Sequence, residues 1–206
     1  MIVRVAFRRM GSRTLRWVWR CLVVTGLAAI GVYVWSIADA AWYQTSQTAV
    51  FREATVPAAV PEVSPVAVRG AARPAKGDPR AWGRLEIPKV NLAVVVREGI
   101  DSRTLRRAVG HVPGTALPGD AGNVVIAGHR DTFFRDLRRV ERGDELRLTT
   151  AAGAFRYRVT GLKIVGPEAV DEMAFTSEPS LTLVTCFPFR YVGPATRRLV
   201  VRAIQD

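Results

Sequence analysis

Two side chains suited to covalent acyl chemistry each end a stretch that is typical of a β-strand. The alternating run "SLTLVTC" (180–186) ends in Cys186, the only cysteine of the chain besides Cys21. The apolar run "NVVIAGH" (123–129) ends in His129. A cysteine attacks an acyl carbon when a partner such as histidine activates its thiol, and the two can be distant in sequence. The sequence therefore offers a cysteine–histidine pair at the ends of two strands.

Acyl transfer also needs a donor for the oxyanion that forms on the attacked carbonyl, and arginine is suited to that role. The stretch "ATRRLVVRAI" (195–204) alternates, and Arg197 begins its more apolar face. Arg198 starts the opposite face, whereas Arg202 lies about 13 Å further along it at strand rise. If the last two strands pair, Arg198 is nearest to the cysteine. We therefore expect Arg198 to be the donor, with Arg197 as the second choice.

The chain's other histidine, His111 in "GHVPGT", also follows a glycine. It precedes a turn-rich loop rather than a polar strand exit. We interpret His111 as a structural residue or as part of a substrate rim. The two histidines and two cysteines are not clustered, so the sequence predicts no zinc site.

No cofactor is expected either. The one metal alternative, calcium binding through Glu168, Asp171 and Glu172, comes from a family resemblance and not from the spacing of these residues. Acidic residues in one short stretch are more often part of a solvated loop, and we favour that interpretation.

The elements that must hold these side chains are mostly strands. Strand patterns occur at residues 82–90, 92–99, 123–129, 144–150, 154–165, 180–186 and 197–204. Short helices are predicted over 101–110, which has an Asp/Ser start and a glycine stop, and over 131–140. About eight short strands with one or two small helices are typical of a single mostly-β domain, a barrel or a sandwich.

The N-terminus has the pattern of a membrane anchor. Six arginines lie between residues 4 and 20, and residues 21–38 carry no charge. Since about 20 apolar residues span a bilayer and positive charge stays inside, we expect residues 1–20 in the cytoplasm and a transmembrane anchor over 21–43. The alternative is a cleaved signal peptide with Ala38-Asp39-Ala40 as its site, but the apolar run is longer than a typical h-region.

The remainder of the chain divides into a linker and one exported domain. Residues 44–80 contain five prolines, which oppose regular structure and predict an extended tether. Residues 81–206 form the predicted catalytic domain. The formal net charge is +12, of which the short N-terminal segment 1–43 carries +5, and no basic cluster carries a nucleic-acid motif, so nucleic-acid binding is not expected.

Together these residues resemble the sortases, membrane-tethered cysteine transpeptidases of the bacterial surface. The resemblance is carried by "TLVTC" (182–186), by "AGHRDTFF" (127–134) and by an arginine at the start of the next strand. "GRLEIPKV" (83–90) and "TCFPFRYVGPATRRLVV" (185–201) are most similar to the class D branch. The similarity covers about residues 82–204, and it implies a closed eight-stranded β-barrel.

The resemblance also implies roles for individual residues. Cys186 would be the nucleophile, His129 the acid and base, and Arg198 the residue that holds substrate and stabilises the oxyanion. Thr185, Val184 and Arg130 are the expected substrate contacts.

Sortases cut an LPxTG-like sorting signal after its threonine, and class D members are often associated with LPxTA. They pass the acyl group to an amine of a peptidoglycan precursor or a pilin lysine. The expected partners are therefore surface proteins that carry a sorting signal, and such an amine acceptor.

Two alternatives compete with this interpretation. An L,D-transpeptidase would carry a SxGC-like segment, but no glycine precedes Cys186. A non-catalytic, membrane-tethered envelope protein could use the same barrel. All three expected residue types are present, which favours the enzyme.

Overall fold

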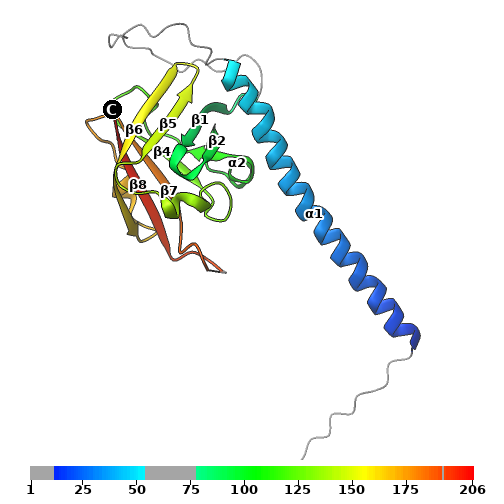
Figure 1. Ribbon diagram of the computed structural model, residues 1–206. Helices are drawn as coiled ribbons and strands as arrows, with labels where there is room; N and C mark the ends of the chain where they lie inside the picture. Colours follow the sequence, from blue (N-terminus) through cyan, green and yellow to red (C-terminus); the bar gives the residue numbers. More distant parts are fainter. Residues whose placement is uncertain (1–11, 54–77, 192) are drawn as a thin grey trace, which may run out of the picture. The chain divides into compact units, whose positions relative to one another are not determined.

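The computed structural model describes residues 12–53, 78–191 and 193–206 (Figure 1). The chain divides into two compact units between Asp39 and Ala40. The first unit holds most of helix α1 (Ser12–Glu53), whose side chains there are almost all exposed. The helix is long and apolar enough to cross a membrane over Leu15–Thr48. This composition is compatible with the expected anchor.

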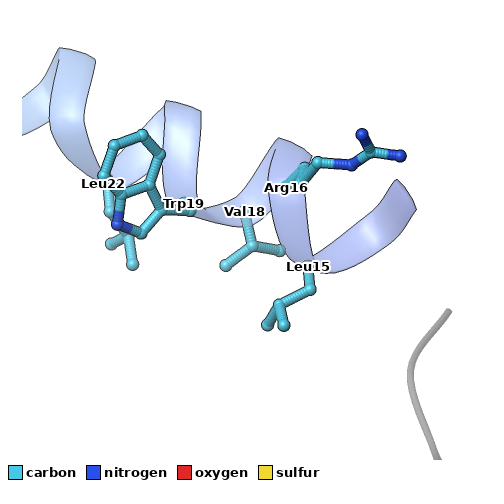
Figure 2. A pocket seen from close by; sticks show the side chains of 5 residues that line it. All are labelled: Leu15, Arg16, Val18, Trp19 and Leu22. Carbon is cyan, nitrogen blue, oxygen red and sulfur yellow. The ribbon is translucent and has the colours of Figure 1, made fainter. Parts of the chain in front are cut away.

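Near the start of α1, four apolar side chains at positions i, i+3, i+4 and i+7 share one side of the helix. Leu15, Val18, Trp19 and Leu22 line a shallow surface pocket together with Arg16 (Figure 2). The apolar side chains are exposed, as lipid-facing residues of a single helix would be. An aromatic ring beside an arginine is typical of a helix end at a membrane interface.

Helix α1 is longer than the sequence pattern indicated. The expected end of the span was residue 43, whereas the helix continues to Glu53. No proline occurs before Pro57, so nothing in residues 44–53 interrupts helical hydrogen bonding. The proline-containing part of the expected linker, residues 54–77, lies outside the described residues.

The second unit is a closed barrel of eight strands in the order β1-β2-β3-β4-β7-β8-β6-β5 (Figure 1). The strands are β1 (Ala81–Ile87), β2 (Leu92–Glu98), β3 (Val109–His111), β4 (Asn123–Gly128), β5 (Glu145–Thr150), β6 (Gly153–Val165), β7 (Ser180–Phe187) and β8 (Arg197–Gln205). The predicted eight-stranded barrel is confirmed. Most neighbouring strands are antiparallel, but β2 pairs with β3 and β4 with β7 in parallel.

Short helical segments connect the strands. They are the helix α2 (Ser102–Arg107) and the 3₁₀ turns η1 (Pro88–Val90), η2 (Arg135–Arg139) and η3 (Val170–Met173). Asp101 caps α2 by accepting hydrogen bonds from the backbone of Arg103 and Thr104. The expected helix over 131–140 is only the five-residue turn η2, and the three-residue strand β3 had not been predicted.

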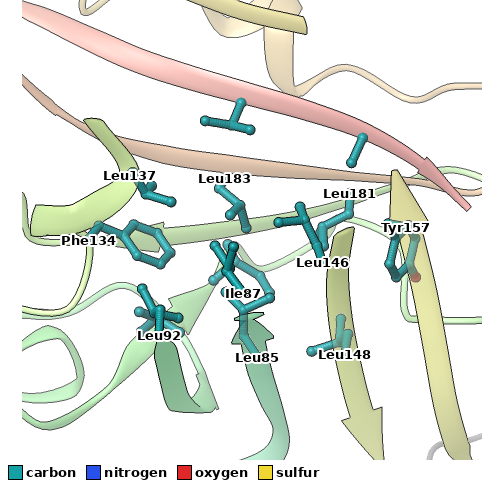
Figure 3. Close-up of a cluster of buried hydrophobic side chains, with 14 of the residues drawn as sticks. Leu85, Ile87, Leu92, Phe134, Leu137, Leu146, Leu148, Tyr157, Leu181 and Leu183 are labelled. Carbon is teal, nitrogen blue, oxygen red and sulfur yellow. The ribbon is translucent and has the colours of Figure 1, made fainter. Parts of the chain in front are cut away.

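Alternating apolar side chains from the strands fill the barrel (Figure 3). Leu85 and Ile87 of β1 meet Leu181 and Leu183 of β7 in one continuous cluster, and all four are fully buried. Phe134 enters the same cluster from the segment after β4. Because one face of each strand points inward, the alternate residues face the outer surface.

The last turns of α1 belong to the barrel unit. Gln44 bonds to the backbone of both α2 and β2: its Nε2 donates to the carbonyl of Arg107 (2.6 Å) and its Oε1 accepts from the amide of Val95 (2.9 Å). The buried Tyr43 donates its hydroxyl proton to Asp78 (3.0 Å). These contacts make residues 40–48 a structural part of the barrel rather than a tether.

Candidate active site

Three adjacent strands bring the predicted reactive residues together. The parallel pair β4–β7 ends with Gly128 opposite Thr185. His129 is the first residue after β4, and Cys186 follows Thr185 within β7, so the two residues come directly after the last paired positions. On the other side of β7, the antiparallel register places Cys186 opposite Arg198 of β8. Adjacent strands are about 4.8 Å apart, so the backbone of Cys186 lies one strand spacing from that of Arg198, and the strand on its other side is the one that leads into His129.

The reactive side chains point away from the core. Leu183 and Leu199 belong to the buried cluster, so their alternate neighbours on β7 and β8 face outward. Cys186 and Arg198 are half-buried and His129 is exposed. Opposite residues on paired strands share a face, which puts the thiol and the guanidinium on the same side of the sheet. The arrangement leaves the thiol reachable from solvent.

Close packing behind His129 fixes the end of β4. A Cβ built on Gly128 would lie 2.7 Å from the ring of Phe134, so only glycine fits there. The Phe134 amide in turn donates to the carbonyl of His129 (3.1 Å). The sequence "GHRDTFF" is thus a turn in which the buried phenylalanine holds the histidine backbone.

The three expected substrate contacts occupy different environments. Thr185 is buried and donates its hydroxyl proton to the carbonyl of Gly128 (2.8 Å), which ties β7 to β4 beside Cys186. Arg130 is buried as well, and it donates to backbone carbonyls of the loop that joins β7 to β8. Only Val184 is half-buried on the outer face. Thr185 and Arg130 therefore have partners within the protein.

The competing arginines are engaged elsewhere. The Arg197 guanidinium lies over the ring of Phe187, 5.5 Å from its centroid. Arg202 donates to the carbonyl of Glu172 (3.0 Å), far along β8 from the cysteine. Arg198 donates to the carbonyl of Arg197 (3.1 Å). Of the three, Arg198 is the one in register with Cys186.

His111 lies in the barrel wall and not beside Cys186. It is 2% exposed, and its Nδ1 is 2.8 Å from a carboxylate oxygen of Glu98. Its Nε2 contacts the hydroxyl of Thr115 (2.9 Å) and the carbonyl of Ala116 (3.1 Å). The ring therefore fastens the start of the β3–β4 loop to β2.

Of the acidic residues considered for calcium, Glu172 has basic side chains as its partners. Its carboxylate forms an ion pair with Lys163 at 2.8 Å, and its backbone carbonyl accepts a hydrogen bond from the guanidinium of Arg202. Among the described residues, no three His, Cys, Asp or Glu side chains gather as metal ligands.

Asn123, at the end of β4 opposite to His129, is a buried polar residue that the strand pattern did not single out. Its Oδ1 accepts from Thr182 (2.8 Å) and its Nδ2 donates to the carbonyl of Ala174 (3.3 Å). These bonds connect the residue after η3 to the paired strands β4 and β7, at the ends where both strands begin. The one available signal was a buried-type strand that begins with a polar residue.

Comparisons with known proteins identify relatives across the barrel unit. The sortase domain family matches residues 85–206. Sortase D of Bacillus subtilis is 40% identical over 123 residues, which are 59% of this chain and 62% of that protein. Sortase SrtE1 of Streptomyces coelicolor is 32% identical over 128 residues, 53% of this chain and 36% of that protein. The matches thus span less than two thirds of these relatives' own length.

Solved structures that are similar to the barrel unit are also sortases. A sortase D5 transpeptidase of Clostridium perfringens has a TM-score of 0.56 and 29% identity, covering 61% of this chain and 79% of its own. Sortase A of Corynebacterium diphtheriae has a TM-score of 0.59 and 28% identity, covering 65% of this chain and 64% of its own.

Proposed function

Because this chain belongs to the sortase family, we propose that it is a membrane-anchored cysteine transpeptidase that cuts a sorting signal and transfers the acyl fragment to an amine. The observation that carries the proposal is the register of three strands. Cys186 of β7 is paired with Arg198 of β8, and β4, the neighbour of β7 on its other side, leads directly into His129, which supports a site made of these three residues. The 40% identity to sortase D of B. subtilis supports the same reaction class.

In the first half-reaction, the sulfur of Cys186 attacks the carbonyl carbon of the signal's threonine. The carbonyl electrons move to oxygen, and the Arg198 guanidinium stabilises that negative charge. His129, as an imidazolium, gives its proton to the leaving amine, and the C–N bond breaks. A thioester between the substrate and Cys186 remains.

In the second half-reaction, an amine attacks the thioester carbonyl. His129, now neutral, accepts the proton of that amine while the C–S bond breaks and the thiolate of Cys186 is restored. Water can replace the amine, and the product is then a free carboxylate. The exposed position of His129 is suited to exchange between leaving and incoming amines.

The substrates proposed for this chain are exported proteins with an LPxTG- or LPxTA-like C-terminal signal. The acceptor amine comes from a peptidoglycan precursor or a pilin lysine. Helix α1 would hold the enzyme in the cell membrane, with the N-terminus in the cytoplasm and the barrel outside. A sortase C of Streptococcus pneumoniae, 25% identical with a TM-score of 0.57, has been described in terms of pilin substrate specificity.

The proposal is tested with full-length protein in detergent micelles, fluorogenic LPxTG and LPxTA peptides, and an added amine. We expect amine-dependent product from at least one peptide and none from Cys186→Ala. Product formation that survives this substitution would remove Cys186 as the nucleophile. Failure of the unmodified protein to cut either peptide would favour a non-catalytic envelope protein.

A further inference from the structure

The residue after His129 ties together two parts of the active site. Arg130 donates from Nη1 to the carbonyl of Pro188 (3.0 Å), and from Nη2 to the carbonyls of Tyr191 and Gly193 (2.9 Å each). These three carbonyls belong to the loop between β7 and β8. One guanidinium thus holds three carbonyl groups of the loop backbone beside the end of β4.

The burial of this arginine is unusual enough to need a reason. Arg130 is only 7% exposed, although an arginine is seldom buried without a charged partner. The nearest carboxylate is that of Asp131, which is 3.5 Å from Nε and largely exposed. The charge is therefore compensated mainly by the three carbonyl dipoles. Arginine suits this task because its donors form a rigid planar fork, which a lysine ammonium cannot reproduce.

The clamped loop connects the strands of the other two reactive residues. It leaves Cys186 at the end of β7 and returns to Arg198 at the start of β8. The Arg130 side chain therefore links the backbone that carries His129 to the loop that sets both of its partners. Nothing else among the described hydrogen bonds joins residues 129–131 to the loop carbonyls.

We propose that Arg130 is a positioning residue that holds the β7–β8 loop, and with it Arg198, in register with Cys186 and His129. It acts through the loop and not on substrate, in contrast to the direct contact expected from the sequence. The inference rests on the proposed function for its kinetic part only. The clamp itself can be tested in a protein without measurable activity.

The structural test uses an exposed tryptic site inside the loop. Arg190 lies between two of the clamped carbonyls and is exposed. We compare Arg130→Gln and Arg130→Lys with the unmodified full-length protein in detergent, and follow cleavage after Arg190 by mass spectrometry. Cleavage after Arg139, in the turn η2, is the internal reference. Loss of the clamp should speed cleavage after Arg190 by about tenfold and leave cleavage after Arg139 unchanged.

The kinetic test uses the same variants with the sorting peptide that the unmodified protein cuts. We expect kcat to fall by about tenfold to hundredfold, because small misplacements of reacting groups have large effects on rate. KM should change by less than about threefold, since Arg130 does not touch substrate. Arg130→Lys should behave like Arg130→Gln, because it keeps the charge but not the fork.

The matched control is Arg135→Gln, which removes one exposed arginine five residues further on. It should leave kcat and the rates of cleavage after Arg190 and Arg139 as in the unmodified protein. If Arg130→Gln does not fold, Arg130→Lys carries both tests alone.

Three results would overturn the inference. The first is an Arg130→Lys protein with full kcat. The second is a loop that is cleaved no faster in either variant. The third is faster cleavage after Arg190 with unchanged kcat, which would leave a clamp without a positioning role. An unmodified protein that cuts no sorting peptide would refute the proposed function instead, while the proteolysis would still decide whether the clamp exists.

Discussion

Cys186 of β7 and Arg198 of β8 face each other directly as partners in an antiparallel strand pair. The neighbouring pair, Phe187 and Arg197, has the opposite orientation, and there the guanidinium rests on the aromatic ring. The pleat of the sheet therefore puts the two consecutive arginines on opposite faces of β8. One shares the face of the thiol and the other packs on a ring.

This relationship predicts opposite outcomes for two adjacent substitutions. Arg198→Ala should lower kcat for peptide cleavage by about 100-fold to 1,000-fold, the usual effect of removing an oxyanion donor. Arg197→Ala should retain most of its activity. Steady-state kinetics of the two variants measure the difference. Equal losses, or a larger loss at Arg197, would contradict the assignment of Arg198.

A second prediction concerns the glycine before the histidine. Gly128→Ala would place a methyl group within 3 Å of three atoms of the buried Phe134 ring, so the ring or the strand end must move. We expect a destabilisation of about 1–3 kcal/mol from overpacking, together with a loss of activity through His129. Gly161→Ala is the control, because its added Cβ meets nothing within 4 Å. Thermal unfolding and activity are measured for both, and equal effects at both positions would refute the packing argument.

The third prediction concerns the buried phenol of Tyr157. Its hydroxyl has no hydrogen-bond partner among the described residues, and such a buried polar group is costly. Tyr157→Phe should therefore raise the free energy of unfolding by about 1 kcal/mol near neutral pH.

Tyr157 also determines the direction in which the stability of the protein changes at high pH. Burial raises the pKa of Tyr157 above its ordinary value of 10.0, because the folded state disfavours the phenolate. The stability linked to this group is fully present below pH 10, and it is lost as the unfolded chain ionises at higher pH. The advantage of Tyr157→Phe should thus grow above pH 10 in chemical denaturation. An advantage that shrinks there would contradict the burial of this phenol.

The fourth prediction concerns the end of α1 that belongs to the barrel. Gln44→Ala would leave the Val95 amide and the Arg107 carbonyl without the side chain that now bonds both. Unsatisfied buried groups cost about 1–3 kcal/mol each, so we expect a clear drop in the melting temperature of the barrel. Thr45→Ala is the control, since its hydroxyl only bonds within the exposed helix surface. An equal drop in both variants would mean that the Gln44 contacts contribute nothing specific.

The sequence predicts those parts of the fold and the site whose signal lies within one segment of the chain. The alternation of residues 197–204 and the run ending in Cys186 were enough to place Arg198 on the outer face, and the pairing of β7 with β8 follows that expectation. The strand β3 was missed because Val109–His111 is too short to show a period of two.

The remaining differences come from contacts between distant segments. The parallel pairing of β4 with β7 joins residues more than 50 positions apart, and no local pattern records it. The helical conformation of residues 44–53 is stabilised partly by contacts with β2 and α2, as for Gln44. The expectation for Arg130 was a contact with substrate, and its hydrogen bonds to carbonyls 58 to 63 residues further along the chain leave no local pattern in the sequence.

The most direct test of the central claim is the mass of the protein during turnover. Full-length protein is mixed with a sorting peptide without added amine, quenched in acid, and analysed by intact and peptide mass spectrometry. The assignment of Cys186 predicts an added mass equal to the peptide up to its threonine, located on Cys186, released by an amine, and absent in Cys186→Ala. An adduct on any other residue, or cleavage by Cys186→Ala, would contradict it.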